Sequence, residues 1–398
     1  MSVMTDRRYP RRDFLRMAAS GAALTFVAPH LALAKAAAER RFVFVIQRGA
    51  ADGLDTLLPY ADPGYARLRG AMALDPGTAI HLDGSFALHP ALVEIARLHA
   101  AREALFVHAV ASPYRDRSHF DGQNVLETGG VTPYQLKDGW LNRLVGLLPR
   151  ADKEAIAFSA TVPVALRGPA EVASYAPSAL PQATDDLMLR VTQLYQNDAQ
   201  LHALWTSAMD TRDIAMGGEG GAVRPRQDGA SIGKLAAGFL ARPDGPRIAM
   251  IETGGWDTHS AQNARLAAQL RNLDAMIAAL RDGMGGGWSD TVVLVATEFG
   301  RTAAANGTNG TDHGTGAVAM LLGGAVQGGC VLADWPGLAS GQLLENRDLR
   351  PTTALDALIA QASGECFGID PQRLGRSLFP KGGAGPGAAG YALPRLIR

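Results

Sequence analysis

Four short apolar runs constrain the fold of this chain more than any other feature of its sequence. The runs FVFVIQ, EALFVHAVA, RIAMIET and TVVLVATEF are almost continuously apolar and do not alternate between apolar and polar residues. A strand that is buried on both faces has this pattern, and such strands are typical of parallel sheets with helices on either side. The sequence therefore predicts an α/β fold, a three-layer sandwich with a mostly parallel central sheet.

Segments with helical spacing separate these runs and support the alternation. The polar, glycine-rich segment 208–230 is expected to be a surface loop. Because the chain has no evident internal repeat, residues 35–398 are expected to form a single domain. The strands are expected at 42–47, 103–111, 247–253 and 291–299, the helices at 88–101, 138–150, 185–207, 231–241, 260–282 and within 351–368, and a further apolar stretch at 317–326.

The N-terminus has the pattern of an export signal. In RRDFLRMAASGAALTFVAPHLALAKA, paired arginines precede a modest apolar stretch and small residues near Ala34. This pattern predicts a twin-arginine signal over 1–34, cleaved after Ala34. The alternative, a membrane anchor, needs a longer apolar run than this interrupted one. We therefore expect export by the twin-arginine translocase, a periplasmic or otherwise exported protein, and no stable membrane insertion after cleavage.

Charge and cysteine content argue against nucleic-acid binding and against a metal site made of cysteines. The chain has 38 basic and 38 acidic side chains, so no excess of charge points to nucleic acid as a partner. Its two cysteines, Cys330 and Cys366, lack the spacing of a metal-thiolate motif. They are compatible with one disulfide in an oxidising compartment or with two buried thiols.

Acidic side chains, histidines or both follow each of the four predicted strands. The carboxyl ends of parallel strands meet at one edge of a sheet, and ligands bind there. Carboxylates and imidazoles together suit divalent metal ions such as Zn, Mn, Mg or Ca. The sequence thus predicts a metal site at this edge. Its candidate residues are Asp52, Asp257, His259, Glu298, Asp312 and His313 as metal ligands, and Ser118 and His119 as catalytic residues.

Each of these residues also has a simpler interpretation. An Asp that precedes a helix is usually a cap, and Asp257 or Thr258, before SAQNARL, is open to this interpretation. A lone His is more often a structural residue with a hydrogen-bond partner. Arg115, Arg117 and Arg301 carry guanidinium groups that suit phosphate, sulfate or carboxylate, although solvated or ion-paired arginines are the plainer alternative.

Several motifs resemble one bacterial protein family. The twin-arginine start and the stretches RGAADGLDTLLP, LHPAL, PYRDRSHFDGQNVLETG, GGWDTH, TEFGRT and NGTDHGTG are similar to the family known as domain of unknown function 1501. That family is placed in the alkaline phosphatase-like superfamily, together with sulfatases and phosphodiesterases. The resemblance implies an alkaline phosphatase-like fold, a two-metal site at the carboxyl ends of the sheet, and transfer of a phosphoryl or sulfuryl group.

Residue by residue, the resemblance is partial. It places the superfamily's first-strand Asp at Asp52, a middle pair at Asp257 and His259, and the final histidine at His313, with Asp312 as an extra acid. Where the superfamily has an Asp-His pair after a later strand, this chain has Glu298 and Phe299. The nucleophile position is an arginine, Arg115, and Ser118 is the hydroxyl beside His119.

The resulting hypothesis is an exported metal-dependent hydrolase whose partner is a small anionic ester, a phosphate or a sulfate. The metal would polarise the ester oxygen, and Arg115 or Arg301 would steady the anion. One alternative is an envelope protein of the same fold that has lost catalysis and binds a ligand or partner. Another is a structural metal site.

Overall fold

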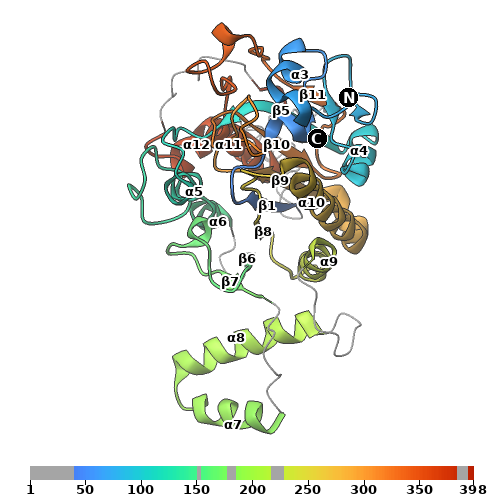
Figure 1. The fold of residues 1–398 in the computed structure, drawn as a ribbon. Helices are drawn as coiled ribbons and strands as arrows, with labels where there is room; N and C mark the ends of the chain where they lie inside the picture. The colour runs from blue at the N-terminus through green and yellow to red at the C-terminus, as the bar shows by residue number, and fades with distance from the viewer. Residues whose placement is uncertain (1–39, 150–153, 177–184, 217–227, 383–392) are drawn as a thin grey trace, which may run out of the picture.

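The computed structural model describes residues 40–149, 154–176, 185–216, 228–382 and 393–398; the predicted signal over 1–34 lies outside them. A nine-stranded sheet crosses the described part of the chain in the order β11-β5-β10-β9-β1-β8-β6-β7, and β12 pairs with β5 (Figure 1). Its strands are β1 (Arg41–Gln47), β5 (Ala104–Ala111), β6 (Ala155–Phe158), β7 (Ala173–Ser174), β8 (Ile248–Thr253), β9 (Thr291–Ala296), β10 (Ala317–Leu322), β11 (Cys330–Leu332) and β12 (Thr353–Ala354).

Helices cover both faces of this sheet, so the predicted three-layer α/β architecture with a mostly parallel sheet is confirmed. The main helices are α4 (Val93–Ala100), α5 (His119–Thr128), α6 (Trp140–Leu147), α9 (Gly229–Leu240), α10 (Gln262–Met284), α11 (Leu355–Phe367) and α12 (Pro371–Leu378). A small sheet, β2 (Leu57–Leu58), β4 (Ala87–Leu88) and β3 (Ile80–His81), lies with α2 (Gly53–Thr56) and α3 (Pro63–Arg69) in the segment between β1 and β5.

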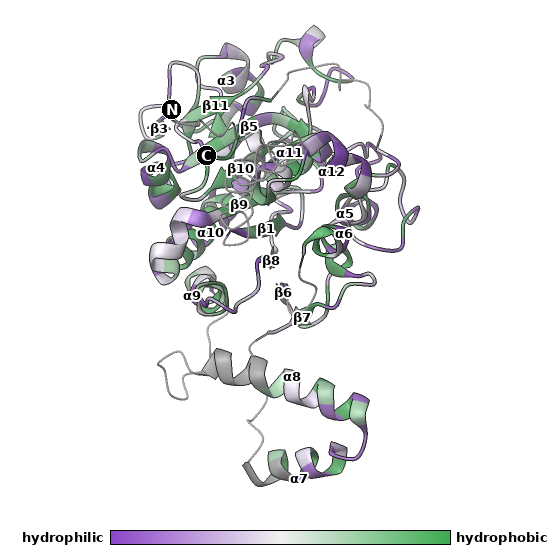
Figure 2. Cartoon of the chain, turned by 180° about the vertical axis from the view of Figure 1, so that it is seen from behind, coloured by the Kyte–Doolittle hydropathy of each residue, from purple (hydrophilic) through white to green (hydrophobic). Residues whose placement is uncertain are grey.

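The central strand β1 shows why a continuous apolar run is needed. Successive side chains of a strand point to opposite faces, and all seven residues of β1 are buried. Phe42 and Phe44 belong to the core beneath α5, α6, α11 and α12, and Trp140 packs edge-on against both of their rings. Val43 and Val45 belong to the other core, beneath α4, α9 and α10. The central strands and the helices α6 and α9 are accordingly largely hydrophobic (Figure 2).

Strand β10 is the one departure from parallel order in this sheet. It runs antiparallel to both of its neighbours, β5 and β9, whereas the other described strand pairs are parallel. A reversed strand begins at the edge where its parallel neighbours end. The loop from β9 to β10 therefore stays at this one edge, and residues at both of its ends can reach the same site.

The segment predicted as one helix over 185–207 and a loop over 208–230 folds differently. The structure has two helices, α7 (Asp185–Tyr195) and α8 (Ala199–Met216), which lie apart from the sheet layers (Figure 1). Asp198 separates them because its carboxylate caps α8, accepting hydrogen bonds from the amides of Gln200 and Leu201. The loop prediction was therefore wrong for 208–216, where the chain has no glycine or proline; residues 217–227 lie outside the described residues.

The structure also describes the two cysteines and the apolar character of the helices. Cys330 is exposed, Cys366 is buried, and both thiols are free, so the alternative of a disulfide between them does not hold. Within the described residues, no helix combines the length and the apolar character that a membrane crossing requires.

Candidate functional site

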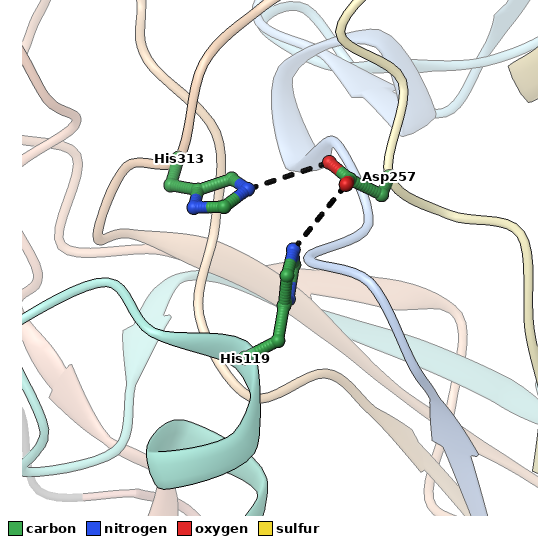
Figure 3. Close-up of side chains that lie close together, drawn as sticks. All are labelled: His119, Asp257 and His313. Atoms are coloured by element: carbon green, nitrogen blue, oxygen red, sulfur yellow. Dashed lines mark ion pairs between the residues drawn. The ribbon is translucent and has the colours of Figure 1, made fainter.

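Loops from three parts of the chain bring a group of histidines together at the edge of the sheet described above. His119 is the first residue of α5 and comes after the loop that follows β5. Asp257 and His259 lie in the loop between β8 and α10, and His313 lies shortly before β10. Figure 3 shows the side chains of His119, Asp257 and His313 pointing toward one another from these separate segments.

The carboxylate of Asp257 lies at the centre of this group. Nε2 of His119 is 3.5 Å from Asp257 Oδ2, and Nε2 of His313 is 3.4 Å from Asp257 Oδ1. The ligand atoms of these three residues lie within 4.8 Å of one another, so together they could hold a metal ion. His259 adds a third imidazole, with its Nε2 at 3.1 Å from Asp257 Oδ1 and 2.9 Å from His313 Nε2. We call these four residues the imidazole cluster.

Each imidazole is held through its Nδ1 atom by a different acceptor. Nδ1 of His119 lies 2.9 Å from Glu298 Oε1, Nδ1 of His259 lies 3.1 Å from Asp312 Oδ1, and Nδ1 of His313 lies 2.9 Å from the carbonyl oxygen of Arg117. A carbonyl oxygen can only accept, and an ionised carboxylate can only accept, so all three Nδ1 atoms donate. In the neutral rings, the lone pairs of all three Nε2 atoms are then directed toward the cluster.

This arrangement calls for a cation. The Nε2 atoms of His259 and His313 face each other at 2.9 Å, and two lone pairs at that distance repel unless a proton or a metal ion lies between them. Nε2 of His119 is buried and has no hydrogen-bond partner among the described residues. A buried polar atom without a partner is costly, and metal-binding histidines typically donate their other ring nitrogen to a carboxylate or carbonyl. The donor set therefore fits a divalent metal ion.

Glu298 and Asp312, which the sequence suggested as ligands, lie behind the imidazoles. Glu298 is fully buried, and its Oε1 also accepts hydrogen bonds from the Gly49 amide at 2.8 Å and from Gln123 Nε2 at 3.1 Å. Asp312 accepts a hydrogen bond from Asn306 Nδ2 at 3.1 Å in addition to that of His259. Both carboxylates thus orient an imidazole and have partners of their own.

Arg301 holds the central carboxylate from inside the protein. Its guanidinium is fully buried, and Nη1 donates to Asp257 Oδ1 at 2.6 Å while Nε donates to Thr311 Oγ1 at 3.1 Å. A hydrogen bond from Nη2 to the carbonyl of Thr311 adds a third contact. The side chain that the sequence suggested as an anion holder is therefore already bound to Asp257 and Thr311.

The charges of the cluster shift the protonation of its members. The hydrogen bond to Glu298 raises the pKa of His119, against the opposing effect of burial. Burial lowers the pKa of His313. Burial would raise the pKa of Asp257, but the hydrogen bond and charge of Arg301 outweigh it and hold that pKa below its ordinary value. Asp257 is thus kept ionised, as a metal ligand must be.

Phe299 forms the floor of the cluster. Its ring stacks on His119 with centroids 5.1 Å apart and planes at 22°, and it lies 5.4 Å from the ring of His313. Phe299 is buried with Tyr114 and Val125 in a small apolar group. Phe299 therefore packs against two imidazoles supplied from elsewhere in this chain.

Asp52 lies beside the cluster in a different environment. With Asp55, Arg69 and Gln262 it forms what we call the buried ion cluster, in which all four side chains are almost completely buried. Arg69 donates to both oxygens of Asp52, at 2.6 and 3.0 Å, and to Asp55 at 3.1 Å. Gln262 Nε2 donates to both carboxylates, at 2.8 and 2.7 Å. The structure therefore pairs Asp52 with an arginine, whereas the sequence suggested a metal ligand.

The guanidinium groups of Arg115 and Arg117 make their hydrogen bonds outside the imidazole cluster. Arg115 donates to the carbonyl oxygens of Ser112 and Tyr114, and burial lowers its pKa. Arg117 pairs with Asp348. Ser118 is the N-cap residue of α5, and its hydroxyl makes no hydrogen bond among the described residues. The structure therefore brings together His119, Asp257, His259 and His313, while the Arg115 guanidinium is bound to backbone carbonyls.

Two glycines let the loops of the site approach closely. Gly49 has φ +119°, and a Cβ built there would lie 2.7 Å from the amide nitrogen of Asp257. A Cβ on Gly310 would lie 2.2 Å from the carbonyl carbon of His259. Only glycine fits where two backbones meet in this way. The loops are thus locked together without side chains between them.

Fold and site together define an α/β protein with a histidine-rich, carboxylate-centred cluster at the carboxyl ends of its strands. The family described as "Protein of unknown function (DUF1501)" matches residues 101–378, and the chain belongs to this family. Comparison with curated proteins found no match.

Solved structures resemble the chain only distantly. One is the C-terminal periplasmic domain of EcEptC from Escherichia coli in complex with Zn, at 9% identity and TM-score 0.36, covering 71% of this chain and 73% of that one. A phosphonate monoester hydrolase of Agrobacterium radiobacter has 11% identity and TM-score 0.34, with coverages of 76% and 72%. The PsFucS1 sulfatase from Pseudoalteromonas sp. has 13% identity and TM-score 0.35, with coverages of 84% and 68%.

Proposed function

We propose that this protein is an exported, metal-dependent hydrolase of phosphate or sulfate esters. The observation that carries the proposal is the imidazole cluster: three imidazoles are fixed through Nδ1, and their Nε2 atoms gather around the ionised carboxylate of Asp257. His119, Asp257 and His313 would hold the ion, and His259 lies close enough to complete the set. The motif resemblance described above supports the class of ester and the route of export.

The donor set indicates which metals to expect. Imidazole nitrogen suits Zn, Mn or Fe, whereas Mg and Ca prefer sites made of oxygen alone. When bound, such an ion supplies Lewis acidity toward an ester oxygen and lowers the pKa of a coordinated water. The site is open to solvent, because the side chains of Asp257 and His259 are 42% and 43% exposed. A substrate could therefore reach it.

The protein's own residues would fix and balance this site. Arg301 keeps the Asp257 carboxylate ionised and in place, and Glu298 and Asp312 fix the rings of their histidines. Because Arg69 already neutralises Asp52, we expect one ion per chain and no second metal at Asp52.

A second candidate has one observation in its favour. Arg115, Arg117 and Arg301 all have partners within the protein, so none of these three guanidinium groups is free to clamp an anion. A metal-binding protein of the cell envelope that binds a ligand without hydrolysing it would also fit. Turnover of an ester separates the two candidates.

The test is a metal analysis of the purified exported protein, followed by an assay of phosphate monoesters, phosphate diesters and sulfate esters with Zn or Mn added. We expect about one bound ion per chain and hydrolysis that His313→Ala abolishes. The matched control is His202→Ala, at an exposed histidine on α8. No stoichiometric metal, or equal activity in His313→Ala, would refute the proposal; metal without turnover would favour the second candidate.

A further inference from the structure

The carbonyl group that fixes His313 belongs to a residue in an unfavourable backbone conformation. Arg117 has φ +61°, in the left-handed region that L-residues other than Asn and Asp seldom occupy. Its carbonyl oxygen accepts the Nδ1–H of His313 at 2.9 Å. Such conformations persist only where the surrounding structure enforces them, and they concentrate at functional sites.

The side chain of Arg117 provides the enforcement. Its Nε and Nη2 both donate to Oδ2 of Asp348, at 3.1 and 2.8 Å, and Nη2 also reaches Glu345 at 2.7 Å. Asp348 is fully buried, so its carboxylate is a fixed point to which this arginine is tied.

The same carboxylate also holds the segment before β10 on which His313 lies. Thr315, two residues after His313, donates its hydroxyl to Asp348 Oδ2 at 2.8 Å. Arg347 donates to Asp348 Oδ1 at 3.2 Å and to the carbonyl oxygen of His313 at 2.9 Å. Asp348 therefore ties both the histidine segment and the arginine whose carbonyl sets the histidine's orientation.

We propose that Arg117 is a positioning residue: anchored by Asp348, it holds its own backbone left-handed so that its carbonyl keeps the ring of His313 with Nε2 toward Asp257. The expected effect on Zn affinity rests on the proposed metal site, whereas the contacts among Arg117, Asp348 and His313 do not depend on it. The guanidinium itself plays no part in binding a substrate anion. Its function is to hold a peptide group in place.

Alanine and glycine at position 117 should have different effects. Arg117→Ala loses the anchor and keeps the cost of a left-handed backbone, so the peptide should turn and release His313. Arg117→Gly also loses the anchor, but glycine adopts φ +61° at no steric cost. We expect Arg117→Ala to weaken Zn affinity about 10- to 100-fold, as losing an outer partner of a ligand does. Arg117→Gly should recover about fivefold or more of this loss.

Arg102 is the matched control. It is also an arginine with φ +61°, but it is exposed in the loop before β5, away from the imidazole cluster. Arg102→Ala and Arg102→Gly should differ from each other in stability as the pair at Arg117 does, but neither should alter Zn affinity. This comparison separates backbone strain in general from strain that serves the site.

A measurement without metal keeps this inference distinct from the proposed function. The side-chain 15N chemical shifts of histidine report which ring nitrogen carries the proton. In the metal-free protein we expect His313 as the Nδ1–H tautomer, a mixture of tautomers in Arg117→Ala, and a return toward Nδ1–H in Arg117→Gly. If the wild-type protein binds no metal, the proposed function fails, and the tautomers still decide the inference.

Two results would overturn it. The first is an Arg117→Ala protein with unchanged His313 tautomer and Zn affinity. The second is an Arg117→Gly protein no better than Arg117→Ala, which would mean that the guanidinium acts in some way other than by holding the backbone left-handed. Should Arg117→Ala fail to fold, Arg117→Lys serves instead: a single ammonium cannot reproduce the forked contact with Asp348, so an unchanged tautomer and affinity there would equally refute the proposal.

Discussion

Two polar clusters lie side by side at the same edge of the sheet, and they differ in where the cation that balances their carboxylates comes from. In the buried ion cluster, Arg69 lies between Asp52 and Asp55 and supplies the cation from within the chain. In the imidazole cluster, three Nε2 atoms and the Asp257 carboxylate converge, and Arg301 binds that carboxylate from behind. Thr311 joins the two clusters through hydrogen bonds to Arg301 and Gln262.

The difference shows how a structural cluster can be told from a binding site. A buried charge that the chain itself neutralises makes folding depend on its partner, because removing the partner leaves an uncompensated buried ion. Ligand atoms that face one another without a cation cost stability, and a chain keeps them where an ion from outside completes them. Substitutions in the buried ion cluster should therefore lower the free energy of unfolding, whereas substitutions in the imidazole cluster should weaken metal binding.

The largest effect on stability is expected for Arg69→Met. This variant removes the cation from two buried carboxylates and should lower the free energy of unfolding by about 3–5 kcal/mol. Urea denaturation of the metal-free protein measures it. Arg97→Met is the control, because the Arg97 side chain is 68% exposed in a surface pair with Glu94 and should cost about 0–1 kcal/mol. Loss of metal from Arg69→Met with unchanged stability would reverse the assignment of the two clusters.

Gly49→Ala should affect the imidazole cluster through the backbone. The added Cβ would meet the Asp257 amide at 2.7 Å, and the φ of +119° is strained for alanine. We expect a loss of about 1–3 kcal/mol from strain, a further loss from the clash, and weaker Zn binding because Asp257 is displaced. The control is Gly70→Ala, with φ +53° and nothing within 4 Å of the new Cβ. Equal effects of both variants on Zn affinity would show that the contact with Asp257 is unimportant.

The sequence predicted the fold well where burial dictates the residue types. The runs of β1, β5, β8 and β9 are apolar because both faces of these strands are covered, and this can be read from composition alone. Short edge strands such as β7, with two residues, leave no such pattern. The reversal of β10 also leaves none, because an apolar run looks the same in either direction.

The site was predicted as a set of residues but not as a set of roles. Residue types and strand ends were enough to gather Asp257, His259 and His313 at one edge. They could not show that Glu298 and Asp312 contact the rings from behind, because a ligand and a ligand's partner are the same kind of carboxylate. The spacing of residues along the sequence does not show which side chains far apart in the chain contact each other. The contacts between Arg69 and Asp52 and between Arg117 and His313 are of this kind.

A moderate effect is expected for Asp312→Asn. The amide can still contact Nδ1 of His259, but its lost charge makes this imidazole a weaker ligand. We expect Zn affinity to fall about tenfold, the lower end of the range for such partners, since the Asp312 side chain is 52% exposed. Competition with a coloured chelator measures it. Asp282→Asn, at a carboxylate that is 68% exposed and paired with Arg281, is the control and should change nothing. Unchanged affinity in Asp312→Asn would leave His259 outside the metal site.

The smallest effect is a shift in pH dependence, expected for Glu298→Gln. The glutamine oxygen can keep the contacts with His119 and Gly49 while the charge is lost. Glu298 raises the pKa of His119 above its ordinary value of 6.5. In the metal-free wild type, the proton on His119 therefore contributes stability that is complete below about pH 6.5 and is lost as the pH rises through the folded-state pKa.

Metal binding has to displace this same proton, so Zn affinity should fall as the pH drops through the raised pKa of His119. In Glu298→Gln, the decrease in Zn affinity should occur at lower pH. The stability that protonated His119 contributes at low pH should also be lost. The opposite contribution of His313, whose pKa burial lowers, stays in both proteins and cancels when they are compared. Zn titrations and urea denaturation between about pH 5 and pH 8 cover the window in which a histidine titrates. An unchanged midpoint in Glu298→Gln would mean that His119 is not the group that proton and metal share.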